Sequence, residues 1–177
     1  MGTAGVAFSE LIAYTDYERA EWRAWFGTGD VAARRLAITT GAGAAEQRGI
    51  RTVGELILHI FVAETHHVER LTKRPLTEPP EGVAQDVEAL FDFGARGRRA
   101  LEAYVGSVDA AGWDVPREFD IFPGRPVRVM PRKFVTHILV HEIRHWAQVG
   151  TMVRMAGDPG PAPDLLFSAV MSGGADE

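Results

Sequence analysis

Apolar residues recur at three- and four-residue spacings through four long stretches of the chain, which is the period of amphipathic helices. The pattern predicts helices over residues 8–26, 52–72, 86–108 and 131–155. Ser9 is the expected N-cap of the first helix, and Gly27 is expected to end it. Thr52 with Glu55 forms a capping-box pattern at the start of the second helix, and Pro131 suits the first turn of the fourth.

The connecting segments are less regular than these helices. Residues 30–47 fit either a short helix or, over Leu36–Thr40, a strand, and Gly41–Gly43 interrupts the pattern. Prolines punctuate residues 112–131, where Val127–Val129 is the expected extended piece.

Four long amphipathic helices predict an all-α protein, a four-helix bundle with a short extra C-terminal helix. Asp164 is expected to cap that extra helix over residues 165–170, and residues 172–177 are expected to be disordered. Gly94 and Gly97 weaken the prediction for the third helix, because glycine costs about 1 kcal/mol relative to alanine inside a helix. A length of 177 residues suits a single domain over residues 1–177.

The composition argues against some classes of binding partner and excludes cysteine chemistry. A net charge of −5 argues against nucleic acid or an anionic membrane as the main partner. No apolar run approaches the roughly 20 residues of a membrane span, and the N-terminus lacks a signal pattern, so we expect a cytoplasmic protein. The absence of cysteine excludes disulfides and thiolate ligands, so a bound metal would need His, Asp or Glu.

All six histidines fall on two of the predicted helices, the second and the fourth. His137, His141 and His145 recur every four residues, and imidazoles at positions i and i+4 can bind one ion. Three in succession fan over about 80°, so one ion would take two of them and the third would lie beside it. The spacing leaves open which two. Gln148 returns to nearly the same face as His137.

The second helix contains His59, His66 and His67. His59 lies in an apolar stretch and is either a core histidine bonded to a carbonyl or a metal ligand, and the histidines of the fourth helix favour the ligand. His66 and His67 lie near the helix C-terminus, where a cation is favourable and solvation is expected. His66 is a reserve ligand, because it lies two turns from His59.

His141-Glu142-Ile143-Arg144-His145 also matches H-E-x-x-H, the helix motif of zinc peptidases in which the glutamate is the general base. The extended motif would place a third histidine where this chain has Thr151. The zinc-peptidase interpretation is therefore the weakest one. The other interpretation of Glu142 is a solvated residue or a member of an interhelical ion pair.

Three segments resemble the DinB superfamily, the metal-binding four-helix bundles that include DinB-like and YfiT-like proteins. They are an N-terminal helix with Tyr14, Trp22 and Trp25, the Glu55–Ile60 segment, and the His137–Gln148 segment. Trp146-Ala147 departs from the Arg-Gly that is common in the family, and residues 112–131 find no match there.

The resemblance implies that His59, His141 and His145 bind one divalent metal ion, with zinc or nickel favoured and manganese or iron also compatible. His137 and Gln148 would then line the pocket or hydrogen-bond the ligands. Three imidazoles leave a coordination position open, as in catalytic sites.

The resemblance further implies thiol-dependent transfer, with a low-molecular-weight thiol activated at the metal, or metal-assisted hydrolysis of a small-molecule substrate. The alternatives are a non-catalytic metal-binding or stress-associated interaction protein and a purely structural bundle. A homodimer is compatible with the aromatic residues Trp22, Trp25 and Trp113, which equally suit a core.

Overall fold

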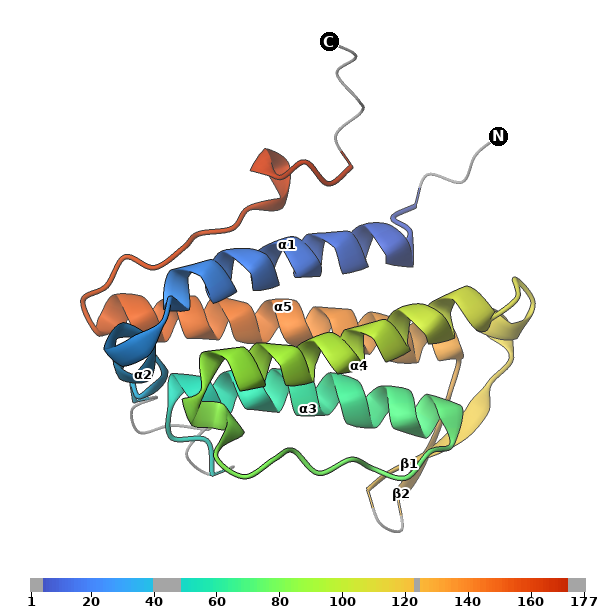
Figure 1. The fold of residues 1–177 in the computed structure, drawn as a ribbon. Helices are drawn as coiled ribbons and strands as arrows, with labels where there is room; N and C mark the ends of the chain where they lie inside the picture. The colour runs from blue at the N-terminus through green and yellow to red at the C-terminus, as the bar shows by residue number, and fades with distance from the viewer. Residues whose placement is uncertain (1–4, 40–48, 123–124, 172–177) are drawn as a thin grey trace.

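The computed structural model describes residues 5–39, 49–122 and 125–171, and these residues form a mostly helical fold (Figure 1). The α-helices are α1 (Phe8–Phe26), α2 (Gly29–Leu36), α3 (Val53–Thr72), α4 (Val87–Ser107) and α5 (Pro131–Met155). The strands β1 (Arg117–Phe122) and β2 (Arg125–Val129) pair antiparallel between α4 and α5. The predictions for Gly41–Gly43 and for residues 172–177 lie outside the described residues.

The four long helices begin and end within one residue of the predicted bounds. At the start of α3, the Thr52 hydroxyl accepts from the Glu55 N–H at 3.2 Å, and the Glu55 carboxylate accepts from the Thr52 N–H at 3.0 Å. The prediction of Ser9 as an N-cap is wrong. The N-cap of α1 is Ala7, whose N–H donates to the Glu10 carboxylate at 2.6 Å.

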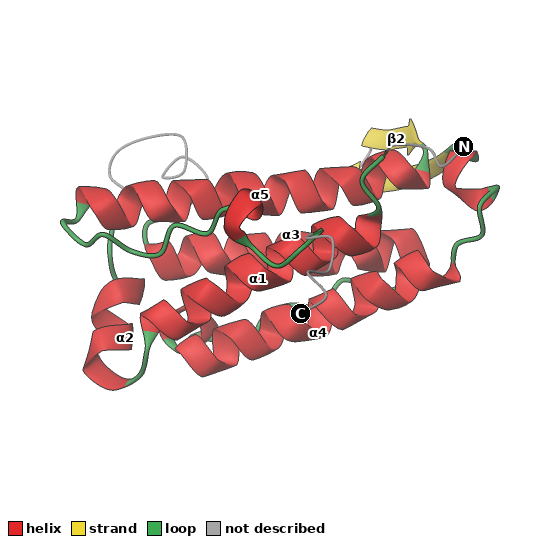
Figure 2. Ribbon diagram, turned by 90° about the horizontal axis from the view of Figure 1, so that it is seen from above, coloured by secondary structure: helices red, strands yellow, loops and turns green. Residues whose placement is uncertain are grey.

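The four long helices lie side by side, with α1 and α5 on one side of the molecule and α3 and α4 on the other (Figure 1, Figure 2). His59 contacts His145 while His67 contacts His137, so α3 and α5 run antiparallel. In contrast, α3 and α4 run parallel, and the connection over residues 73–86 returns along their length (Figure 1). No helix in the described part of the chain is long and apolar enough to cross a membrane.

The hairpin and α2 are the additions to the predicted helices. The segment for which the sequence allowed either a short helix or a strand forms the helix α2. Thr39 makes only an isolated bridge to Thr52 and is not part of a strand. The predicted C-terminal helix is a single 3-10 turn over Leu165–Phe167, capped by Asp164. The expected extended piece is part of β2, and the hairpin packs on the start of α5 through Phe119, whose ring lies 4.8 Å from that of Phe134.

Gly94 and Gly97 bring α4 close to α3 without interrupting the helix. A Cβ atom at Gly94 would lie 2.7 Å from the Phe61 ring, and one at Gly97 would lie 2.5 Å from the Thr65 hydroxyl. The two glycines therefore cost some helix propensity but allow a close contact that larger residues would prevent.

A layer of four charged residues divides the apolar interior into two clusters. On α5, Glu142 separates Leu139 of one cluster from Trp146 of the other. The other three long helices each contribute one residue at the same level, namely Arg19, Glu64 and Arg98.

Each arginine of this charged layer contacts both glutamates. Arg19 donates to Glu142 at 2.5 and 2.9 Å and to Glu64 at 3.0 Å. Arg98 lies 2.6 Å from Glu142 and 3.2 Å from Glu64. Burial alone would raise the pKa of Glu142, but Arg19 and Arg98 lower it below its ordinary value. Glu142 is therefore ionised in the folded protein.

Replacing Glu142 with alanine would leave two buried guanidinium groups opposite a single buried carboxylate, that of Glu64. We expect Glu142→Ala to lower the free energy of unfolding by about 3–5 kcal/mol, the usual cost of breaking a buried ion pair. Urea denaturation in the presence of a chelator measures this without a contribution from bound metal. The control is Glu88→Ala, which removes an exposed partner of Arg23 and should cost less than about 1 kcal/mol. Equal effects of the two variants would contradict the prediction.

Candidate metal centre

His59 of α3 and His141 and His145 of α5 come together between the two helices. One ring nitrogen from each lies within 4.8 Å of the others, and all three side chains are half-buried. The Nε2 atoms of His141 and His145 are 3.0 Å apart. Two nitrogens bound to one tetrahedral zinc ion at about 2.0–2.1 Å would lie about 3.3 Å apart, so the donor atoms present fit such an ion.

The hydrogen bond to Gln148 orients His145. Its Nδ1 lies 2.6 Å from the amide oxygen of Gln148. Because an amide oxygen only accepts, Nδ1 carries the proton, and Nε2 keeps its lone pair on the side of His141. Gln148 is therefore placed to orient the imidazole of His145.

The surroundings of His141 favour its neutral form. Burial, followed by the neighbouring imidazoles of His145 and His59, lowers the pKa of His141 to about 3. A metal ligand must be unprotonated, so His141 is ready to bind a metal at neutral pH without losing a proton.

Two further histidines extend the row between α3 and α5. The ring of His137 lies 5.8 Å from that of His141 and stacks on His67 at 5.5 Å. His67 also packs against Phe134, whose ring is 5.1 Å away. The expectation that His67 is solvated is therefore wrong. His66 does not reach the triad either, because its Nε2 lies 2.9 Å from the carbonyl oxygen of Thr77.

Glu142 points into the charged layer rather than toward the triad. It is 1% exposed and held by Arg19 and Arg98, and it also accepts from the Trp146 indole N–H at 3.1 Å. A general base needs a free carboxylate beside the metal. The geometry thus favours the interhelical ion pair over the peptidase interpretation. The partners of Glu142 on α1 and α4 could not be predicted from the sequence.

The large aromatic residues near the triad belong to the core. Trp146 is 1% exposed and stacks on Trp22, whose ring centroid is 5.9 Å away. Phe61 is also buried and contacts Trp146 at 6.1 Å. Exposed His137 and Gln148 lie beside the half-buried triad, so the triad lies near the surface of the molecule.

The histidine pKa values predict how stability depends on pH. Burial lowers the pKa of His67 to about 4, from an ordinary value of 6.5. A histidine whose pKa is lower in the folded state stabilises the fold fully above the unfolded pKa, and this stabilisation is lost as the pH falls toward the folded pKa. We expect the Tm of chelator-treated protein to fall between pH 7 and pH 5, and to fall less in His67→Asn. His66→Asn is the control, and parallel curves for all proteins would contradict the prediction.

A family model described as the DinB family matches residues 37–175, a span that includes α3, α4 and α5 and all six histidines. Comparison with curated proteins finds no match. The matched span covers most of the chain and confirms the resemblance seen in the sequence. The chain belongs to the DinB family.

Proposed function

We propose that the protein is a metal-dependent enzyme whose four long helices are the bundle of its family. His59, His141 and His145 would bind one divalent metal ion, with zinc or nickel favoured. The observation that carries this proposal is the convergence of three half-buried imidazoles, whose ring nitrogens lie within 4.8 Å of one another. An ion held there would supply a Lewis acid with an open position.

Among the reactions suggested by the family, transfer of a low-molecular-weight thiol suits the site better than hydrolysis. The triad includes no carboxylate, and Glu142 is engaged with Arg19 and Arg98. Hydrolysis needs a group that accepts a proton from water, whereas a thiol is acidic enough to need less help. His137, exposed beside His141, is the imidazole that would accept a proton from a molecule bound at the triad.

Metal content tests the ligand set directly. Protein purified without a histidine tag should contain close to one metal ion per chain, and both His59→Ala and His141→Ala should lose it. His66→Ala is the matched control, because this imidazole contacts Thr77 and not the triad. Elemental analysis gives the readout. Metal that is absent from the wild-type protein, or retained in His59→Ala, would refute the three-histidine site.

The role of Gln148 can be separated from that of the ligands. Removing a group that orients a metal ligand usually costs 10–100-fold in metal affinity, and we expect about this loss in Gln148→Ala. Gln148→Glu keeps an oxygen acceptor for the His145 Nδ1–H and should restore most of the affinity. Competition with a chromogenic chelator measures both variants. Equal affinity of the alanine variant and the wild type would contradict the assigned role.

A turnover assay distinguishes the enzyme from a metal-binding protein without catalysis. The zinc-loaded and nickel-loaded proteins would be incubated with glutathione and an electrophilic acceptor, and in parallel with an ester. Thiol consumption that saturates and is lost in His141→Ala supports the transferase. Full metal occupancy without turnover of glutathione or any other low-molecular-weight thiol would favour the non-catalytic alternative.

A further inference from the structure

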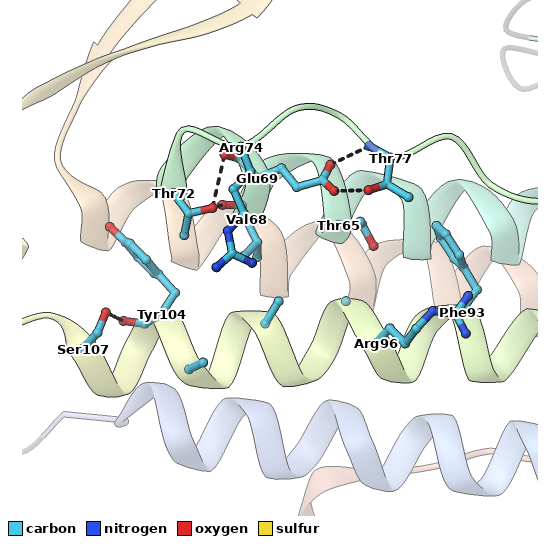
Figure 3. Close-up of a pocket in the computed structure, with 13 residues that line it drawn as sticks. Thr65, Val68, Glu69, Thr72, Arg74, Thr77, Phe93, Arg96, Tyr104 and Ser107 are labelled. Carbon is cyan, nitrogen blue, oxygen red and sulfur yellow. Dashed lines mark hydrogen bonds between the residues drawn. The ribbon is translucent and has the colours of Figure 1, made fainter.

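A cavity of about 470 Å³ lies between α3, α4 and the connection over residues 73–86 (Figure 3). Its volume is in the range of small-molecule sites. The α3 residues that line it, such as Thr65 and Val68, come from a different face of the helix than His59. The cavity is therefore separate from the metal centre.

The walls of the cavity are largely apolar. Val68 of α3 lies between Tyr104 at one end and Phe93 at the other (Figure 3), and Ala100 of α4 also lines the cavity. Gly97 adds no side chain to the α4 wall. An occupant would therefore need an elongated apolar body to displace water from these surfaces.

The polar groups of the cavity are mainly cationic or uncharged. Arg74 reaches from the connection toward α4, and Arg96 lies at the Phe93 end (Figure 3). Within the described residues, neither guanidinium forms an ion pair with a carboxylate. The Thr65 hydroxyl is buried and has no hydrogen-bond partner among the residues that the structure describes. These groups would complement a single negative charge.

The acidic residue of the lining is already used to hold the connection in place. Glu69 accepts from the Thr77 N–H at 3.0 Å and from its hydroxyl at 2.5 Å. His66 also contacts the carbonyl oxygen of Thr77, at 2.9 Å. Two α3 side chains, Glu69 and His66, thus hold the connection that carries Arg74. The Glu69 carboxylate is engaged with Thr77 and is not offered to an occupant.

We propose that this cavity binds an apolar monocarboxylate, with its carboxylate at Arg74 and its chain along Val68 and Ala100. Because Arg96 lies at the Phe93 end, a charged group at Arg74 would meet one guanidinium, which suits a monoanion, whereas a phosphate dianion usually receives more donors. This site would act independently of the metal centre, because none of its lining residues belongs to the triad.

Calorimetric titration of the full-length protein with decanoate tests the proposal, with 1-decanol as the uncharged probe of equal chain length. Decanoate should bind, and decanol should bind at least tenfold more weakly. Arg74→Gln should weaken decanoate binding at least tenfold. Arg99→Gln is the matched control, because Arg99 is exposed on α4 outside this cavity and should leave the affinity unchanged.

A cavity-filling variant locates the bound chain. Ala100→Phe should abolish decanoate binding. Ala100→Leu introduces a smaller side chain that disturbs the packing less, and it should weaken binding. Circular dichroism checks that each variant is folded. His59→Ala should bind decanoate like the wild type, which keeps this result separate from that of the metal experiment.

Three outcomes would overturn the proposal. The first is the absence of decanoate binding at millimolar concentration. The second is equal binding by Arg74→Gln and the wild type, or an equal loss in Arg99→Gln. The third is unchanged affinity in folded Ala100→Phe and Ala100→Leu.

Discussion

Four charged side chains occupy a level of the interior where a helical protein would usually continue its apolar core. Moving ions out of water costs several kcal/mol each, and the attraction between them offsets this only when the geometry is good. Arg19, Glu64, Arg98 and Glu142 meet this condition because each arginine contacts both glutamates. Each residue comes from a different long helix, so a rotation or shift of any one helix would leave buried charge unpaired. The layer therefore fixes the rotation and the level of all four helices together.

The orientation of the metal centre follows from that constraint. With Glu142 held inward by the arginines, the neighbouring His141 and the following turn at His145 face α3. The stacking of Trp146 on Trp22 fixes the same turn of α5 from the core side. Ligands that are held by packing before the metal arrives lose little freedom on binding, which is the condition for an ordered open site. The charged layer thus holds α5 in the orientation that brings His141 and His145 to His59.

The sequence predicted the parts of the fold that depend on local pattern and spacing. Apolar periodicity gave the long helices, and the Thr52 capping box gave the start of α3 almost to the residue. It did not predict that α3 and α4 are parallel, because the direction of a helix depends on how a connection runs and not on the period of the helix. The partners of Glu142 were also hidden, since Arg19 and Arg98 look like ordinary exposed residues on their own helices. Only the packing of four helices shows that they are buried.

For the histidine site, too, the sequence predicted contacts within one helix better than contacts between helices. The i, i+4 spacing indicated that two of His137, His141 and His145 could bind one ion, whereas the choice of His141 and His145 and their pairing with His59 came from the family resemblance. Spacing from His59 made His66 the reserve ligand, but the structure does not bring it to the triad, because the crossing of α5 decides which side chains of α3 it meets. His67 meets His137 and Phe134, while His66 is left to the connection over residues 73–86.

The H-E-x-x-H match shows why a motif needs its surroundings before it indicates a reaction. The two histidines of the motif do face one point, as they would in a peptidase. The glutamate differs, because on a helix it lies about 100° from the preceding histidine, and what packs on that side decides its role. Here that side meets two buried arginines, and their positive charge keeps Glu142 ionised but unavailable as a base. The same five-residue pattern therefore leads to a structural carboxylate beside a histidine cluster, where the neighbouring imidazole of His137 rather than a carboxylate would accept a proton. This is the chemical reason to favour a substrate that brings an acidic proton.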